Sequence, residues 1–192
     1  MTHARPRAAH GRARRMGRGA LAAAGTLAVL TACGGSGGKS AGHTVSPSGA
    51  ASSVGGTRVV AFDDTYAYED GLKVKVTKPT AFKPSVTSLG HRPENSPITF
   101  MVTLTNGTEQ TFQVTGVLVR VTAGESADRA EQIFDTARGV GTPLTGPMAP
   151  GKSATATFAF DVPPADTGRV DIEVRPDFGE KYTSVHWVGP VR

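Results

Sequence analysis

The sequence is poor in cysteine, in charged residues and in aromatic residues. It contains one cysteine among 192 residues, so no disulfide can form within the chain. Charged residues make up 19 % and aromatic residues 6 %, whereas Gly and Pro occupy 24 and 13 positions. This turn-rich composition argues against a helical bundle or a coiled coil and favours an all-β chain.

Acidic residues are missing from the first 32 residues, which contain six arginines. The whole chain has a formal charge of +5, so the remaining 160 residues carry a net charge of −1. The folded part of the chain therefore lacks the excess of positive charge that binds phosphate backbones. We expect no nucleic acid among its partners.

A long apolar run is also missing. The uncharged stretch at residues 20–30 has eleven residues, whereas a helix needs about 20 residues to span the hydrocarbon core of a membrane. A short apolar segment that follows an arginine-rich start is typical of a secretory signal. The sequence therefore predicts export of the protein.

The residues that follow the apolar segment are Leu30, Thr31, Ala32 and Cys33. They resemble the bacterial lipobox, in which the cysteine receives a diacylglyceryl group on its sulfur and becomes the new N-terminus. We expect residues 1–32 to be a lipoprotein signal peptide, and Cys33 to be the acylated residue, with chains such as palmitate. Two or three acyl chains hold a protein on a membrane without a transmembrane helix, which predicts a location on the extracellular face of the cell membrane.

The export route stays open. The pair Arg14 and Arg15 suggests the twin-arginine pathway, but the apolar residues that usually follow the pair are absent. General secretion and twin-arginine export therefore both remain as alternatives.

Residues 33–58 are dominated by Gly, Ser and Ala. Such a segment cannot bury enough apolar surface to offset the entropy of ordering, so we expect a flexible tether. A tether of this length has a mean reach of about 25 to 30 Å. His43 within it is expected to be a solvated spacer residue and not a metal ligand.

From residue 59 onward, short segments alternate between apolar and polar residues, which is typical of strands with one buried face. Dipeptides such as Asp70-Gly71, Asn106-Gly107 and Pro150-Gly151 mark turns between them. Residues 127–137 could form one helical turn or an irregular edge. We predict an immunoglobulin-like antiparallel β-sandwich of about seven strands over residues 59–192. The expected strands lie at residues 66–69, 72–77, 98–105, 117–122, 154–161, 170–175 and 184–188.

Four segments of this domain carry a family resemblance: residues 62–64 (FDD), 68–74 (YEDGLKV), 100–108 (FMVTLTNGT) and 148–153 (MAPGKS). They resemble surface lipoproteins of actinobacteria that form a family known only as a domain of unknown function. That family is related to telokin-like, immunoprotective extracellular domains. The resemblance covers roughly residues 60–190 and implies the fold, because its motifs are strand patterns and turns. It brings no catalytic residues.

No catalytic constellation is evident. His91 and His186 are the histidines of the domain, and the candidate nucleophiles Ser85, Ser88 and Ser153 lie in no GxSxG turn. We therefore expect no enzymatic activity.

No metal or cofactor site is evident either. The acidic pairs Asp63-Asp64 and Glu69-Asp70 lack the spacing of a calcium loop. Met101 and Met148 have no neighbouring histidine of the kind used for copper. We expect neither a bound metal nor a cofactor.

The remaining hypothesis is a binding or adaptor module for a protein or cell-envelope partner. Loops at residues 83–97 and 124–145 are long enough to form a contact surface. Five aromatic residues outside the clearest strands are candidates for contacts or for the core: Phe82, Phe112, Phe178, Tyr182 and Trp187. The alternatives are a carrier of a small ligand or metal ion and, least favoured, an envelope enzyme.

Overall fold

The computed structural model describes residues 52–54 and 57–192. The predicted signal peptide, the lipobox with Cys33 and most of the predicted tether lie outside the described residues. Within the described part, no helix combines the length and the apolar character needed to cross a membrane.

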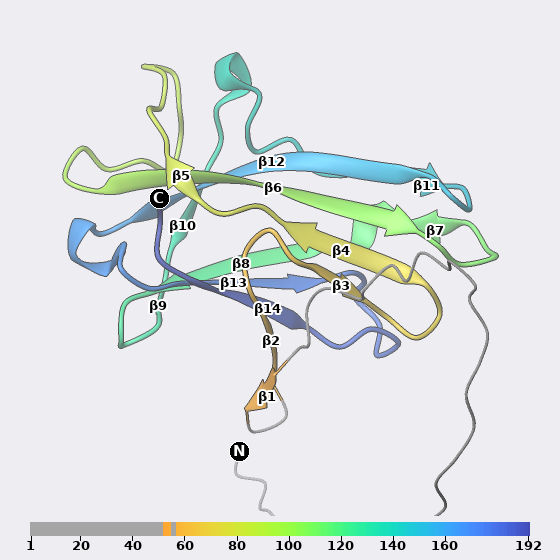
Figure 1. Ribbon diagram of the computed structural model, residues 1–192. Coiled ribbons are helices and arrows are strands. Elements are labelled where there is room, and N and C mark those ends of the chain that lie inside the picture. The colour runs from red at the N-terminus through yellow and green to blue at the C-terminus, as the bar shows by residue number, and fades with distance from the viewer. Residues whose placement is uncertain (1–51, 55–56) are drawn as a thin grey trace, which may run out of the picture. The chain divides into compact units, whose positions relative to one another are not determined.

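Two β-sheets of six strands face each other (Figure 1). The first sheet has the order β1 (Ser52–Val54), β2 (Thr57–Val60), β14 (Val185–Gly189), β13 (Val170–Arg175), β8 (Leu118–Ala123) and β9 (Asp128–Arg129). The second has the order β10 (Glu131–Ile133), β12 (Ser153–Val162), β6 (Ser96–Asn106), β4 (Leu72–Val76) and β3 (Thr65–Ala67), and β5 (Thr80–Ala81) also pairs with β6. All these pairs are antiparallel except β14 with β2.

Short elements complete the described chain. A small third sheet pairs β11 (Pro147–Met148) with β7 (Phe112–Gln113). Three 3₁₀ turns, η1 (Val114–Gly116), η2 (Thr136–Arg138) and η3 (Pro164–Asp166), are the helical segments of the described residues.

The core forms where the alternating strands bury one face against the other sheet. In β4 the burial follows the sequence pattern, with Leu72, Val74 and Val76 buried and the two lysines between them exposed. Trp187 of β14 lies at the centre, fully buried, and its indole Nε1 donates a hydrogen bond to the carbonyl oxygen of Asp64 at 3.2 Å. This satisfies the polar atom of the largest core side chain.

The predicted all-β sandwich is therefore confirmed, and each of the seven predicted segments overlaps a strand. The additional strands are short. The first two, β1 and β2, include residues of the predicted 33–58 tether, so ordered strands begin before the predicted boundary at residue 59. Residues 127–137 contain both β9 and β10, and η2 begins within them.

Strand β12 departs from simple alternation, because its last five residues are all buried. The inner face packs in the main core, and a second small cluster of Ile133, Val140 and Ala159, with Phe82 against it, covers the outer face. Residues of β10 and of the segments that follow β5 and η2 therefore bury part of the outer surface of the second sheet.

Candidate functional site

A cleft of about 300 Å³ opens on the side of the sandwich where β2 of one sheet faces β3 of the other. The turn between β3 and β4 and the loop between β13 and β14 complete its wall. The lining residues are Arg58, Tyr66, Tyr68, Glu69, Asp70, Lys181, Tyr182 and Thr183. All three tyrosines of the chain therefore meet in one place.

The tyrosine rings pack edge to face. The ring centroids of Tyr66 and Tyr68 are 4.9 Å apart with an interplanar angle of 81°. Tyr68 and Tyr182 repeat this arrangement at 4.9 Å and 77°. The hydroxyl of Tyr68 also donates to the carbonyl oxygen of Thr183 at 2.8 Å. Edge-to-face pairs and a satisfied hydroxyl hold these rings in fixed orientations.

Two cations lie beside the rings. The Arg58 guanidinium is 5.8 Å from the centroid of Tyr66 and hydrogen-bonds the hydroxyl of Thr183. The Lys181 ammonium is 4.8 Å from the centroid of Tyr182. Both distances are within the range of cation–π attraction.

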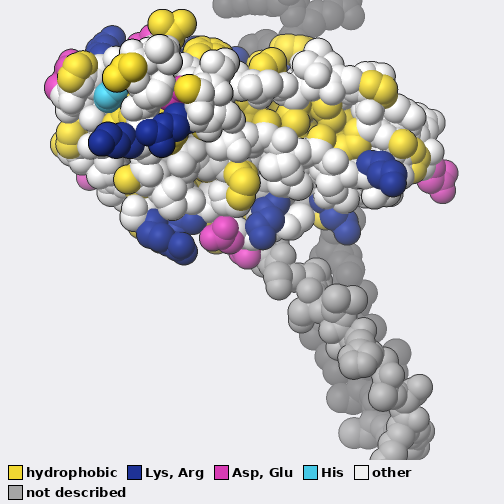
Figure 2. Space-filling model, turned by 90° about the horizontal axis from the view of Figure 1, so that it is seen from above, with side chains coloured by type: hydrophobic (Ala, Val, Ile, Leu, Met, Phe, Trp, Pro, Cys, Tyr) yellow, Lys and Arg dark blue, Asp and Glu magenta, His cyan; other side chains and the backbone are white. Residues whose placement is uncertain are grey.

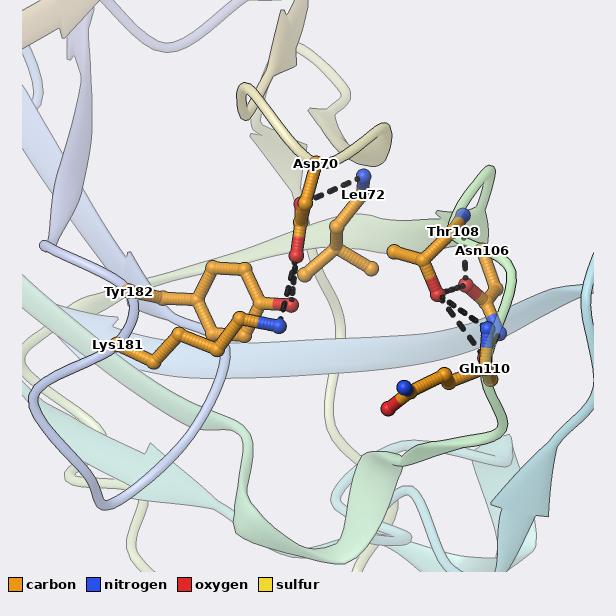
Figure 3. Close-up of polar contacts among 7 residues, drawn as sticks. All are labelled: Asp70, Leu72, Asn106, Thr108, Gln110, Lys181 and Tyr182. Atoms are coloured by element: carbon orange, nitrogen blue, oxygen red, sulfur yellow. Dashed lines mark hydrogen bonds and ion pairs between the residues drawn. The ribbon is translucent and has the colours of Figure 1, made fainter.

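The carboxylate of Asp70 joins the two walls of the cleft (Figure 3). Its Oδ2 accepts hydrogen bonds from the Tyr182 hydroxyl at 2.6 Å and from Lys181 Nζ at 2.8 Å. Its Oδ1 accepts from the backbone N–H of Leu72 at 3.2 Å, two residues along the chain. The hairpin turn predicted at Asp70-Gly71 thus also places a charged group against a loop more than a hundred residues away.

The ionisable groups of the cleft are electrostatically coupled. Partial burial would raise the pKa of Asp70, but the hydrogen bonds from Lys181, Tyr182 and the Leu72 amide outweigh it and lower the pKa. The same bond to Asp70 raises the pKa of Lys181. Burial, aided by Asp70, raises the pKa of Tyr182. Burial, followed by the proximity of Tyr66, raises the pKa of Tyr68. Such a group of perturbed side chains in a cleft marks a functional-site candidate.

Replacement of Asp70 by Asn is expected to give a pH-dependent loss of stability. The pKa of Asp70 is lower in the folded state, so its contribution exists above its unfolded pKa and disappears as the pH falls through the folded pKa. Because the carboxylate is partly exposed, we expect a loss of less than about 1 kcal/mol near neutral pH. Urea unfolding of Asp70→Asn and wild type at neutral and acidic pH measures it, with Glu69→Gln as the control. A difference that persists at low pH would contradict the ion-pair explanation.

A buried amide supports the turn that holds Asp70. Asn106 is fully buried, and its Nδ2 donates to the carbonyl oxygens of Gln110 and Met148, each at 2.8 Å. Its Oδ1 accepts from the amide and the hydroxyl of Thr108 at 3.0 and 2.7 Å (Figure 3). The next residue, Gly107, donates its N–H to the carbonyl oxygen of Gly71 at 3.2 Å. The 106–110 turn therefore braces the turn that carries Asp70.

The histidines and serines considered from the sequence lie in separate places. His91 Nδ1 lies 2.8 Å from the buried carboxylate of Asp161, and His186 Nδ1 lies 2.9 Å from Asp171. The hydroxyl of Ser85 donates to Asp135, and that of Ser153 pairs with Thr105. The hydrogen bonds of the described residues thus join neither histidine to a serine.

The acidic pairs and the methionines are also dispersed. Asp63 accepts from the backbone N–H of Lys78 at 3.3 Å, while Asp70 belongs to the tyrosine cleft. Within residues 52–54 and 57–192, no three side chains of His, Cys, Asp or Glu are grouped to hold a metal ion. Met101 is exposed on β6, and Met148 is buried in β11.

The two long loops contact each other at one end of the sandwich. Leu89 and Phe134 exchange backbone hydrogen bonds at 2.9 and 3.0 Å, and Ser85 hydrogen-bonds Asp135 through its amide and its hydroxyl. Val86, Leu89 and Phe134 are exposed there. Figure 2 shows hydrophobic side chains at this left-hand end of the molecule.

The aromatic residues noted in the sequence divide between core and surface. Phe112, Tyr182 and Trp187 are buried, Phe82 packs on the small second cluster, and Phe178 is exposed. Only Tyr182 of these five lines the cleft. Sequence reasoning missed Tyr66 and Tyr68 as site residues, because they lie in and next to a weakly patterned strand. The one available signal was that tyrosine occurs three times in a chain with few aromatic residues.

Several solved structures share this fold at low sequence identity. The chain is similar to a candidate lipoprotein (ycdA) from Bacillus subtilis, with a TM-score of 0.51 and 15 % identity, over 65 % of this chain and 37 % of that one. The yjhA protein from the same species has a TM-score of 0.52 and 11 % sequence identity, and the match covers 69 % of this chain and 99 % of that one. MPT63, a secreted protein from Mycobacterium tuberculosis, has a TM-score of 0.46 and 14 % sequence identity, and the match covers 70 % of this chain and 98 % of that one. The likenesses to the two Bacillus subtilis proteins show the fold alone, and the chain spans little more than a third of the length of the candidate lipoprotein.

The sequence matches no protein-family profile. It also matches no curated protein.

Proposed function

We propose that this protein is a lipid-anchored binding module on the extracellular face of the cell membrane, and that it has no catalytic role. The arginine-rich start, the short apolar segment and the lipobox ending at Cys33 support the anchor. The four motif segments support membership of the actinobacterial lipoprotein family with telokin-like domains. A structural neighbour described as a lipoprotein also supports the anchor.

The tyrosine cleft is the observation that carries the binding role. It combines three fixed tyrosine rings with two cations, two carboxylates and the hydroxyl of Thr183 in about 300 Å³. A few placed polar groups among aromatic side chains are what ligand sites require. We propose a cell-envelope glycan as the ligand, because a sugar offers C–H faces to the rings and hydroxyls to the charged groups.

Charge supports a neutral ligand better than an ionic one. Asp70 is already paired with Lys181, and Arg58 is engaged with Tyr66 and Thr183. A polyhydroxylated ligand can join such a network without disrupting an ion pair, since each hydroxyl both donates and accepts.

The alternative is a carrier of a small ligand, since the volume of the cleft also suits a compact molecule. The two functions differ in what occupies the same site. A carrier binds its molecule stoichiometrically and gains thermal stability from it, whereas a glycan-binding module also binds intact cell-wall material.

The test is cosedimentation of the full chain, carrying Cys33→Ala to remove the predicted acylation, with purified actinobacterial cell-wall sacculi. We expect Tyr66→Leu and Lys181→Met to weaken binding by about ten-fold or more, as the loss of a central contact does. Lys152→Met is the matched control, because Lys152 is exposed and does not line the cleft.

Unchanged binding by both cleft variants would contradict this site. If sacculi do not bind at all while a metal ion or a small metabolite raises the melting temperature, the carrier function replaces the proposal.

A further inference from the structure

A second binding feature lies on the opposite side of the sandwich, at the edge of β8. Strand β9 pairs with β8 only at Thr122 and Ala123. On the same side of β8, the carbonyl oxygen of Val121 accepts a hydrogen bond from the N–H of Ala130 at 2.9 Å. Residues of an antiparallel strand point their N–H and C=O groups alternately to its two sides. The backbone groups of Val119 therefore point the same way as those of Val121, away from β13.

No hydrogen bond from the described residues reaches Val119 on this outer side. The N–H of Val117, two residues earlier, points to the same side but already donates to the carbonyl oxygen of Val114 at 3.2 Å. One N–H and one C=O of β8 are thus available at an uncovered edge, where an incoming strand pairs.

A groove of about 220 Å³ with an uncharged lining runs beside this edge. Its far wall is the segment that crosses from η2 to β11, anchored where Gly141 N–H bonds to Thr157 and Val114 N–H bonds to Gly146. Its lining includes Val117, Val119, Gln132, Phe134, Gly141 and Leu144. None of these lining residues is charged, so the groove suits an uncharged segment.

We propose that the β8 edge binds an extended uncharged segment of a partner polypeptide by strand addition. Main-chain hydrogen bonds to Val119 supply the affinity for a peptide backbone, and alternate side chains of the segment enter the groove. A glycan cannot reproduce this pairing, because it has no repeating backbone N–H and C=O groups. The site is independent of the tyrosine cleft, with which it shares no residue.

The probe is a fluorescein-labelled, end-blocked peptide of alternating threonine and valine, titrated into the full chain carrying Cys33→Ala. The same peptide with N-methyl groups on alternate residues is the control ligand. We expect Val119→Pro to weaken binding by about ten-fold or more, because proline removes the outward N–H and leaves the pairing with β13 intact. Leu144→Asp is expected to do the same by placing a charge in the groove.

Amide hydrogen exchange of the same protein keeps the test decisive if either variant fails to fold. The peptide is expected to slow exchange at Val119 by about ten-fold or more, and the N-methylated peptide is expected to have no effect. Equal binding of both peptides, or unchanged exchange at Val119, would overturn the proposal. A concentration-dependent dimer that Val119→Pro abolishes would also overturn it, because the occupant would then be a second copy of this chain.

Discussion

Replacing Asn106 with Asp is expected to lower the free energy of unfolding by about 3 to 4 kcal/mol, which is a large part of the stability of a domain this size. The Nδ2 group of Asn106 donates to two carbonyl oxygens, from Gln110 and Met148. A carboxylate oxygen in its place would face both carbonyls with no proton to donate. Because the site is fully buried, water cannot compensate.

The measurement is urea unfolding of Asn106→Asp and wild type, with Gln113→Glu as the matched control. Gln113 is exposed, so the same chemical change there should cost less than about 0.5 kcal/mol. The new carboxyl should have a raised pKa in the folded state, because burial disfavours its charge. Its penalty should therefore decrease as the pH falls. A loss at Asn106 no larger than at Gln113 would show that the amide does not organise the turns.

Replacing Gly71 with Ala is expected to destabilise the domain by about 2 to 4 kcal/mol and to weaken ligand binding in the cleft. Gly71 has φ of +96°, which is unfavourable for a residue with a side chain. A Cβ there would also lie 2.6 Å from the carbonyl oxygen of Gly107, a backbone atom that cannot rotate away. The turn would have to move, and Asp70 would move with it.

The control Gly151→Ala separates the backbone strain at positive φ from the steric clash with Gly107. Gly151 also has positive φ, at +74°, but a Cβ there meets nothing within 4 Å. It should cost only the backbone strain, about 1 to 2 kcal/mol, and leave binding unchanged. Urea unfolding and sacculus binding of both variants measure the difference. Equal losses of stability for the two substitutions would mean that the contact with Gly107 contributes nothing.

The strands were predictable because their burial follows from local sequence. In β4, β13 and residues 98–105 of β6 every second residue is apolar and buried, so the pattern alone predicts both the strand and its buried face. The end of β12 was not predictable in this way. Its outer face is covered by Ile133, at the end of the short strand β10, and by Val140, which follows η2, and neither segment has a regular pattern.

The cleft was largely unpredictable for a related reason. Tyr68 and Tyr182 lie more than a hundred residues apart, and no local spacing indicates that they meet. Asp70-Gly71 and Asn106-Gly107 were each recognisable as turns. The sequence does not show that Gly107 donates to Gly71 and so links the two. Turn chemistry is local, whereas the contact between two turns depends on the register of β4 with β6.

The most direct test of the binding role is a ¹H–¹⁵N spectrum of the full chain, carrying Cys33→Ala, titrated with soluble oligosaccharides released from cell-wall sacculi. The account predicts saturable shift changes concentrated at the backbone amides of residues 66–70 and 181–183, which line the cleft. Shift changes confined to the loops at residues 83–97 and 124–145, or none at saturating oligosaccharide, would contradict it.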